Sequence, residues 1–213
     1  MVRALSVSGE SKEFFAEARI AWLKKCLQDM SSVSTVMDFG CGTGVAVPFL
    51  IDILGAKSVI AIDPSPRIRE VAQLTHGNKP VQFCAPQTYQ PRAEVDLVFC
   101  NGTFHHVVPA ARASTIDYIF QSLRPGGLFV LSENNPWNPG TRYVMSRCAF
   151  DKNAVPLSVR ESHRLVRAQG FEIVRTDFLF VFPRALRWLR GIEPFLARFP
   201  IGAQYQMICL KPE

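Results

Sequence analysis

Residues 36–44 read Val-Met-Asp-Phe-Gly-Cys-Gly-Thr-Gly, an apolar run followed by glycines at alternate positions. The β-branched and apolar residues 35–39 predict a buried parallel strand. Without a Cβ, the glycines let the backbone turn tightly and approach a ligand closely. They are Gly40, Gly42 and Gly44. Because residues 45–54 resume an apolar helical pattern, the loop joins a strand to a helix, where open α/β sheets bind ligands.

A second apolar stretch, residues 58–62, ends at Asp63. An acid at the tip of the second strand, about twenty residues after the loop, is placed to accept hydrogen bonds from ribose hydroxyls. The dinucleotide-binding pattern G-x-G-x-x-G would need a glycine where Val45 stands, and no lysine follows as in a P-loop. The spacing therefore predicts a ligand that carries a ribose, with no support for a dinucleotide or a triphosphate.

The strand, loop and acid resemble the D-x-G-x-G-x-G signature of class I S-adenosylmethionine-dependent methyltransferases. Similar motifs follow in the family's order at residues 63–68, 95–101, 123–127 and 168–171, so the resemblance covers most of the chain. The chain is similar to the small-molecule type within this family, which includes the methyltransferases of ubiquinone and menaquinone biosynthesis. The resemblance implies S-adenosyl-L-methionine as cofactor and S-adenosyl-L-homocysteine as product.

The resemblance also implies a set of cofactor contacts around the predicted sheet edge. Asp38 is expected to organise the loop and meet the amino group of the methionine part, with simple capping of the turn as the alternative. Ile68 is expected to be both a core residue and an adenine contact. The family often has an acid after the alanine that ends the third strand, but here Pro86 follows Ala85, and Gln87 is the nearest polar replacement. The full predicted set is Asp38, Gly40, Cys41, Gly42, Gly44, Asp63, Pro64, Ile68, Ala85, Gln87, Asn101 and Gly102.

Helical and strand patterns alternate along the whole chain. We predict strands at 35–39, 58–62, 81–85, 95–100, 128–132, 171–182 and 204–210, and helices at 10–30, 45–54, 66–75, 109–123 and 158–169. Ser158 and Glu161 form an S-x-x-E capping box at the last helix start. This order predicts an α/β fold, a Rossmann-like, doubly wound, seven-stranded sheet with helices on both faces. The resemblance implies that the last strand runs antiparallel to an otherwise mostly parallel sheet.

Length and composition are those of one ordinary domain. With 213 residues, 48% of them hydrophobic and 20% charged, the chain can bury a sizeable core, so we predict a single methyltransferase domain over residues 1–213. Residues 1–31 form its N-terminal helical segment, and residues 134–157 and 183–203 are expected to lie on the substrate side. No membrane span or signal peptide is evident, which favours a cytoplasmic protein. The six cysteines contain no C-x-x-C pair, so we predict free thiols and no metal site.

Two histidines, His105 and His106, follow the fourth predicted strand, where related enzymes face cofactor and acceptor. Histidine titrates near neutrality and could take the acceptor's proton as the methyl group moves, so both are candidate catalytic residues. The alternative is a structural role. Methyl transfer needs mainly an acceptor atom held in line with the methyl group and sulfur at about 3 Å, so positioning can dominate the rate.

The candidate acceptor residues come from the polar turn at residues 133–139, which is rich in asparagine and proline. We predict acceptor contacts by Asn135, Trp137 and Arg142, although Trp137 could instead pack under the loop. DNA amino-methyltransferases place Asn/Asp-Pro-Pro-aromatic after the fourth strand, whereas this chain has Cys-Asn-Gly-Thr there. That difference argues against DNA bases as substrates.

The whole net charge of +6 lies in one part of the chain, because residues 142–198 contain eleven Lys/Arg and five Asp/Glu. Within it, residues 184–199 pattern as an amphipathic helix with Arg184, Arg187 and Arg198 on one face. Such a helix could lie on an anionic membrane surface or cover an amphiphilic substrate, or simply pack on the sheet. The chain has no run of Lys/Arg and no RNA-binding module, so no nucleic-acid partner is expected.

The predicted function is methyl transfer to a small-molecule or amphiphilic acceptor, such as a phosphorylated, sugar-linked or lipid-linked compound. Oxygen methylation is favoured because a histidine pair is available. The alternatives are a non-catalytic regulatory protein that binds S-adenosylmethionine or S-adenosylhomocysteine, and an RNA or protein methyltransferase. The oligomeric state is left open.

Overall fold

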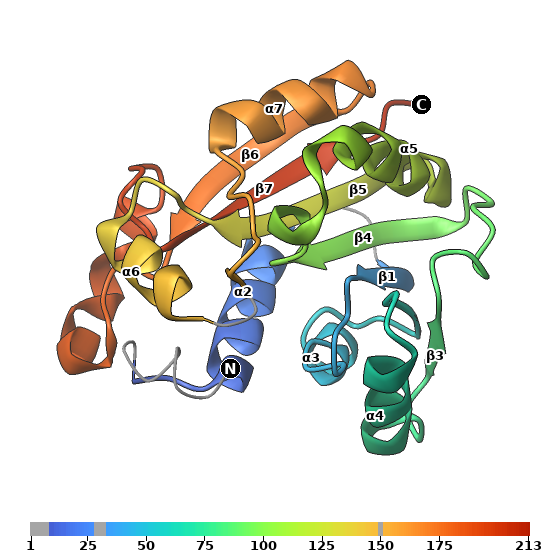
Figure 1. Ribbon diagram of the computed structural model, residues 1–213, viewed down its shortest axis with the longest axis horizontal. Helices are drawn as coiled ribbons and strands as arrows, with labels where there is room; N and C mark the ends of the chain where they lie inside the picture. The colour runs from blue at the N-terminus through green and yellow to red at the C-terminus, as the bar shows by residue number, and fades with distance from the viewer. Residues whose placement is uncertain (1–8, 28–32, 149–150) are drawn as a thin grey trace.

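The computed structural model describes residues 9–27, 33–148 and 151–213, and its centre is a seven-stranded sheet (Figure 1). The strand order is β3-β2-β1-β4-β5-β7-β6. Strands β1 to β5 pair in parallel, while β7 is antiparallel to both of its neighbours. The Rossmann-like fold with an antiparallel last strand is therefore confirmed. The bounds are β1 Thr35–Phe39, β2 Ser58–Ile62, β3 Val81–Cys84, β4 Val95–Asn101, β5 Leu123–Asn134, β6 Glu172–Leu179 and β7 Gln204–Leu210.

Helices cover both faces of the sheet, as predicted. Side chains alternate along a strand, so neighbouring residues of β1 enter different cores. Val36 packs in the core that contains residues of α2 and α3, and Met37 in the core that contains residues of α5 and α7. Figure 1 shows α5 and α7 together on one side and α2 and α3 on the other. The helices are α2 Lys12–Cys26, α3 Val47–Asp52, α4 Pro66–His76, α5 Arg112–Ser122, α6 Pro139–Arg147 and α7 Val159–Ala168, with short 3-10 turns η1 Phe104–His106 and η2 Pro109–Ala111.

Several predicted boundaries were wrong. The N-terminal helix ends at Cys26, and the part of the prediction at residues 28–30 lies outside the described residues. Strand β5 is much longer than residues 128–132, because the backbone around Gly126 and Gly127, which reads as a turn, exchanges hydrogen bonds with Lys211. Strand β6 ends early because Phe180 adopts a positive φ of 63°, which an extended strand does not allow.

The capping box at α7 is only half formed. The Ser158 hydroxyl accepts a hydrogen bond from the Glu161 backbone at 3.3 Å, as predicted. The Glu161 carboxylate does not return to the cap but pairs with Arg112 at 2.8 Å.

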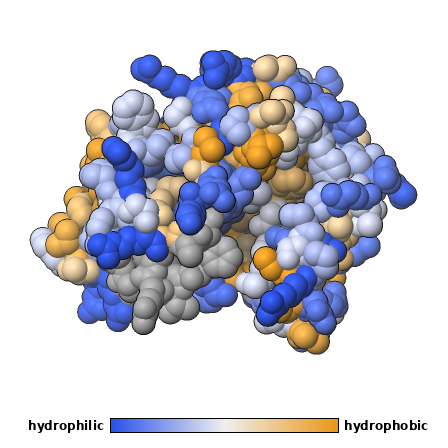
Figure 2. Space-filling view, viewed as in Figure 1, coloured by the Kyte–Doolittle hydropathy of each residue, from blue (hydrophilic) through white to orange (hydrophobic). Residues whose placement is uncertain are grey.

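The prediction of one amphipathic helix over residues 184–199 was wrong. The segment forms a 3-10 helix, η4 Arg184–Ile192, which is irregular at Leu186, and a short α8, Glu193–Leu196. Pro194 lacks a backbone donor and prevents one continuous helix. Large apolar side chains stay exposed here: Leu186, Trp188, Ile192, Phe195 and Phe199. Figure 2 shows an apolar patch at the left end of the view, where Figure 1 places this segment. In the described part of the chain, no helix has the length and apolar character needed to cross a bilayer.

The guanidinium of Arg112 ties the loop after the histidines to the segment that follows α6. This side chain is 1% exposed. It donates to the Glu161 carboxylate at 2.8 Å, the Val155 carbonyl at 2.6 Å and the Val107 carbonyl at 3.2 Å. One side chain therefore satisfies groups from three separate segments.

We expect Arg112→Met to lower the free energy of unfolding by about 1–3 kcal/mol, because two carbonyls lose their donor. Urea denaturation followed by circular dichroism measures the change. The matched control is Arg124→Met, which removes a guanidinium that is 39% exposed and pairs with Asp96 at 2.6 Å. An exposed pair contributes about 0–1 kcal/mol, so equal losses in the two variants would contradict the anchoring role.

Candidate functional site

The glycine loop is fastened to the end of the neighbouring strand. The backbone amides of Gly40 and Cys41 both donate to the carbonyl of Ile62, at 2.8 and 3.0 Å. Gly40 has a φ of +79°, and a Cβ there would lie 2.1 Å from Oγ1 of Thr103. Only glycine therefore fits, and the loop packs directly against the loop that follows β4.

Asp63 holds the middle of the same loop. One oxygen of its carboxylate accepts from the Gly42 amide at 3.1 Å and the other from the Ser65 amide at 2.9 Å. Gly42 has a φ of +53°, and a Cβ built on it would meet nothing within 4 Å. The glycine loop thus borders open space beside a buried carboxylate.

Asp38, at the end of β1, has a buried carboxylate whose Oδ2 lacks a hydrogen-bond partner among the described residues. Burial, and secondarily the charge of Asp63, raises the pKa of Asp38 to about 7. A buried carboxylate without a donor is costly, and an ammonium group removes the cost by supplying charge and hydrogen bonds. The unpaired oxygen of Asp38 could accept a hydrogen bond from the amino group of S-adenosylmethionine. The adjacent glycine loop leaves room for the cofactor to approach the protein backbone closely.

The other predicted cofactor residues lie around the same sheet edge, because the parallel strands β1 to β4 end side by side there. Cys41 is buried, Ile68 is half-buried at the start of α4, and Pro64 is exposed. Asn101 ends β4 and has a buried Oδ1 without a partner among the described residues. Ala85 and Gln87 follow β3, half-buried and exposed respectively, and Gly102 follows β4.

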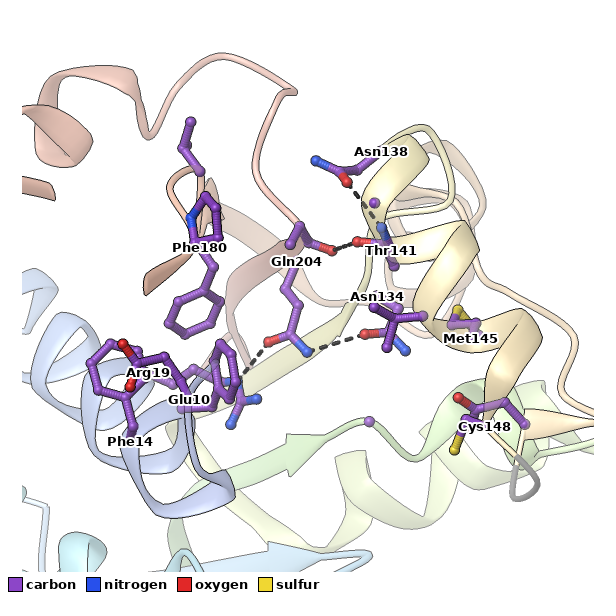
Figure 3. A pocket seen from close by; sticks show the side chains of 18 of the residues that line it. Glu10, Phe14, Arg19, Asn134, Asn138, Thr141, Met145, Cys148, Phe180 and Gln204 are labelled. Atoms are coloured by element: carbon purple, nitrogen blue, oxygen red, sulfur yellow. Dashed lines mark hydrogen bonds between the residues drawn. The ribbon is translucent and has the colours of Figure 1, made fainter. Parts of the chain in front are cut away.

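A cavity of about 520 Å³ lies beside this edge. It is lined by the N-terminal helix, the turn after β4, α6 and the chain around Phe180. Figure 3 shows side chains that enter it from the N-terminal helix, from α6 and from Phe180. Both predicted substrate-side segments contribute. The lining side chains used below are Phe14, Phe15, Arg19, His105, His106, Val144, Met145, Asp151, Phe180 and Gln204.

The histidine turn is supported by a buried acid that sequence reasoning did not assign. Nδ1 of His105 donates to Glu133 at 2.6 Å, and the other oxygen of Glu133 accepts from the Phe104 amide at 2.6 Å. Burial alone lowers the pKa of His105, but the carboxylates of Asp151 and Glu133 outweigh it and raise the pKa to about 9. Burial and the charge of His105 lower the pKa of the more exposed His106.

The predicted acceptor residues lie apart from the cavity lining. The Asn135 side chain is fully buried and donates to the carbonyls of Pro200 and Gly202, while accepting from the Trp137 amide. Trp137 is 74% exposed, so it does not pack under the loop, and Arg142 is also exposed. The asparagines that do line the cavity are the neighbouring Asn134 and Asn138.

Arg19 is the cavity residue that the sequence gave no reason to single out. Its guanidinium donates from Nε to Gln204 at 2.8 Å, and Gln204 donates to Asn134 at 3.1 Å (Figure 3). The rings of Phe15 and Phe180 lie 5.9 and 5.5 Å from its carbon Cζ. Arg19 lies in α2, and its hydrogen-bond partner Gln204 lies in β7, far along the chain. The residues next to Arg19 in the sequence therefore give no indication that it lines a cavity.

Comparison with known proteins agrees with the geometry of the glycine loop. The family described as "Methyltransferase domain" matches residues 12–176. A solved S-adenosylmethionine-dependent methyltransferase from Archaeoglobus fulgidus has a TM-score of 0.71 at 17% identity, and the match covers 94% of this chain and 95% of that one.

Curated relatives match a shorter part of the chain. A carboxy-S-adenosyl-L-methionine synthase from Hydrogenovibrio crunogenus is 32% identical over 106 residues, which are 47% of this chain and 42% of the relative. A tRNA U34 carboxymethyltransferase from Shewanella pealeana is 35% identical over 125 residues, 51% of this chain and 36% of the relative. The matched part thus spans less than half of either relative.

Asp38→Asn should separate stability from cofactor binding. A folded-state pKa raised above the unfolded value means that the carboxylate form destabilises the fold, so the stability of the wild type falls as pH rises from about 4 towards 7. We expect the variant to unfold at a higher temperature than the wild type at pH 8, with a smaller difference at pH 5.5. Its affinity for S-adenosylhomocysteine at pH 8, measured by calorimetry, should fall at least about tenfold because a charged hydrogen bond is lost. Unchanged affinity would remove Asp38 from the cofactor site.

Proposed function

This chain belongs to the methyltransferase-domain family and is a class I S-adenosylmethionine-dependent methyltransferase, and on that premise we propose that it methylates an oxygen atom of an anionic, largely apolar small molecule. The cofactor supplies an electrophilic methyl group on a positively charged sulfur. The protein's task is then to bind the acceptor beside the glycine loop and hold its oxygen in line.

The observation that carries the proposal is the buried cation Arg19. The residue is 7% exposed, and burial lowers the pKa of its guanidinium to about 9, with the charge of Glu133 acting in the opposite direction. No ion pair to Arg19 exists among the described residues, and only Nε makes a hydrogen bond. A buried charge of this kind destabilises a fold unless a partner neutralises it. An anionic group of the acceptor is the partner that a cavity-lining arginine can recruit.

Several other side chains that line the cavity are apolar and favour an acceptor with a hydrocarbon part. Phe14, Phe15 and Phe180 form one side, and Val144 and Met145 of α6 contribute from another element. The second lining arginine, Arg190, already pairs with Glu10 at 3.0 Å and lies over the ring of Phe14. The acceptor is therefore an amphiphile with its charge at Arg19 and its hydrocarbon against the phenylalanines.

The turn after β4 connects the cavity to the cofactor loop. Thr103 packs against Gly40, and His105 and His106 follow within three residues and line the cavity. A hydroxyl or carboxylate oxygen near these imidazoles would lie on the side facing the cofactor. This arrangement supports an oxygen acceptor, because an imidazole near a hydroxyl group can accept the proton that the oxygen loses as it is methylated.

A fatty acid tests the role of Arg19. The wild type should bind dodecanoate about ten times or more tightly than dodecanol, because a hydrogen bond to a charged group contributes about 1.5–3 kcal/mol. Arg19→Met should abolish that preference and leave dodecanol binding unchanged, as measured by calorimetry with S-adenosylhomocysteine present. The variant should be at least as heat-stable as the wild type, because it removes a buried charge. Arg92→Met removes an exposed arginine outside the cavity lining and is the control. A preference for dodecanoate that survives in Arg19→Met would refute the proposal.

We also propose that residues 184–199 contact an anionic membrane surface, the source of such amphiphiles. Trp188 and Phe195 are 75% and 78% exposed, and Arg184, Arg187 and Arg198 are exposed in the same segment. Aromatic side chains beside arginines suit a bilayer interface. The alternative partner is RNA, which the similarity to tRNA U34 carboxymethyltransferases favours.

Sedimentation with phosphatidylglycerol vesicles tests this surface. We expect binding at low salt that Trp188→Ser together with Phe195→Ser weakens at least tenfold, because two exposed aromatic groups no longer insert. The double variant Leu74→Ser and Val108→Ser removes exposed apolar side chains elsewhere and should bind like the wild type. Absence of vesicle binding, together with a gel shift of bulk tRNA, would establish the RNA alternative and overturn the membrane proposal.

A further inference from the structure

Three potential metal ligands from two distant parts of the chain converge on the cavity wall. They are Nε2 of His105, Nε2 of His106 and a carboxylate oxygen of Asp151, and all three lie within 4.8 Å of one another. Oδ1 of Asp151 is 3.6 Å from the first nitrogen and 3.7 Å from the second. We propose that this cluster binds a divalent transition-metal ion of the zinc type.

The spacing suits a metal better than it suits direct hydrogen bonds. Nitrogen and oxygen ligands of zinc lie about 2.0–2.2 Å from the ion, which in a tetrahedron separates two ligands by about 3.4 Å. The distances from Asp151 to His105 and His106 are within a few tenths of an ångström of that value. They are longer than the 2.7–3.2 Å, roughly, of an ordinary N–H···O hydrogen bond.

Glu133 gives His105 the orientation that a metal ligand needs. Because Nδ1 of His105 donates to Glu133 at 2.6 Å, Nε2 is the nitrogen that points to Asp151 and can carry the lone pair. A carboxylate behind a metal-binding imidazole is a recurring arrangement, since it fixes the tautomer and makes the ligand more basic. Glu133 is 1% exposed, so it cannot turn away to water.

The backbone also fixes the distance between the two halves of the cluster. The amide of Val155 donates to the carbonyl of His105 at 2.8 Å, and Arg112 holds the carbonyl of Val155. The amide of Asp151 donates to the carbonyl of Cys148 at 3.1 Å. The ligands are therefore brought together by the fold before any ion arrives.

Two imidazoles and one carboxylate leave at least one coordination position for another molecule, as in zinc enzymes with His₂Glu sites. All three ligands line the acceptor cavity, so that position is accessible from the cavity. An oxygen of the acceptor would fill it, and this role rests on the proposed function. Binding of the ion itself does not, because it depends only on the three ligands and Glu133.

The experiment is a metal titration of tag-free protein that has been stripped with a chelator. Calorimetry with Zn²⁺ should give one ion per chain, and Co²⁺ should give the strong visible absorption of a four- or five-coordinate site. His106→Gln and Asp151→Asn should weaken Zn²⁺ binding at least tenfold, and Glu133→Gln about 10–100-fold through the orientation of His105. His163→Gln is the matched control, because this histidine lies on α7 and bonds Thr176 at 2.9 Å, outside the cluster.

Thermal unfolding guards against variants that lose their fold. Zn²⁺ should raise the unfolding temperature of the wild type and of His163→Gln by more than that of folded His106→Gln. Less than one ion per chain in the wild type, or equal affinity in His106→Gln and His163→Gln, would overturn the metal site. Titration of the metal-free protein with S-adenosylhomocysteine is a separate readout, so loss of the metal proposal would leave the methyltransferase assignment intact.

Discussion

The constraint on which the site depends is the attachment of the glycine loop to the end of β2. Two successive amides, those of Gly40 and Cys41, share the carbonyl of Ile62, and the next glycine amide is held by Asp63. The missing Cβ of Gly40 leaves the space that Thr103 occupies. Since Thr103 begins the turn that carries the histidines, the cofactor loop and the cavity wall are packed as one unit. The rate of methyl transfer depends strongly on the alignment of the acceptor atom with the methyl group. Close packing between the glycine loop and the cavity wall would help to maintain that alignment.

Two buried charged side chains near this connection, Asp38 and Arg19, lower the stability of the free protein. Asp38 has an oxygen without a partner among the described residues, and Arg19 has a guanidinium without an ion pair among them. Each is costly in the free protein, and a bound ligand group of opposite charge would offset that cost. The two groups have opposite charges: Asp38 lies at the end of β1 beside the glycine loop, whereas Arg19 lines the cavity.

Glu133 differs from Asp38 and Arg19, because both oxygens of its carboxylate already accept hydrogen bonds from other residues of the protein. It fixes the 3-10 turn through the Phe104 amide and orients His105 through Nδ1. The resulting arrangement places Asp151 opposite the free nitrogen of His105, with His106 beside it. The same negative charges that raise the pKa of His105 also favour any other cation there. The polar wall of the cavity thus carries a cation at Arg19 and a carboxylate at Asp151.

The sequence alone determined the sheet and the cofactor edge, because both depend on local patterns. Apolar runs of strand length predicted β1, β2 and β7 with their observed bounds, and the glycine spacing predicted the turn after β1. The sequence predicted a ribose contact for Asp63, and did not predict that its carboxylate holds the Gly42 amide. Only the tertiary structure decided the cavity, because Arg19, Asp151 and Gln204 are far apart along the chain and come together only when α2, the segment after α6 and β7 pack around it. It also corrected residues 184–199, where Pro194 and an irregular turn override a helical pattern. The periodicity of apolar residues along a segment indicates which side of a helix or strand is buried. The residues that this side contacts depend on how elements far apart in the sequence pack together.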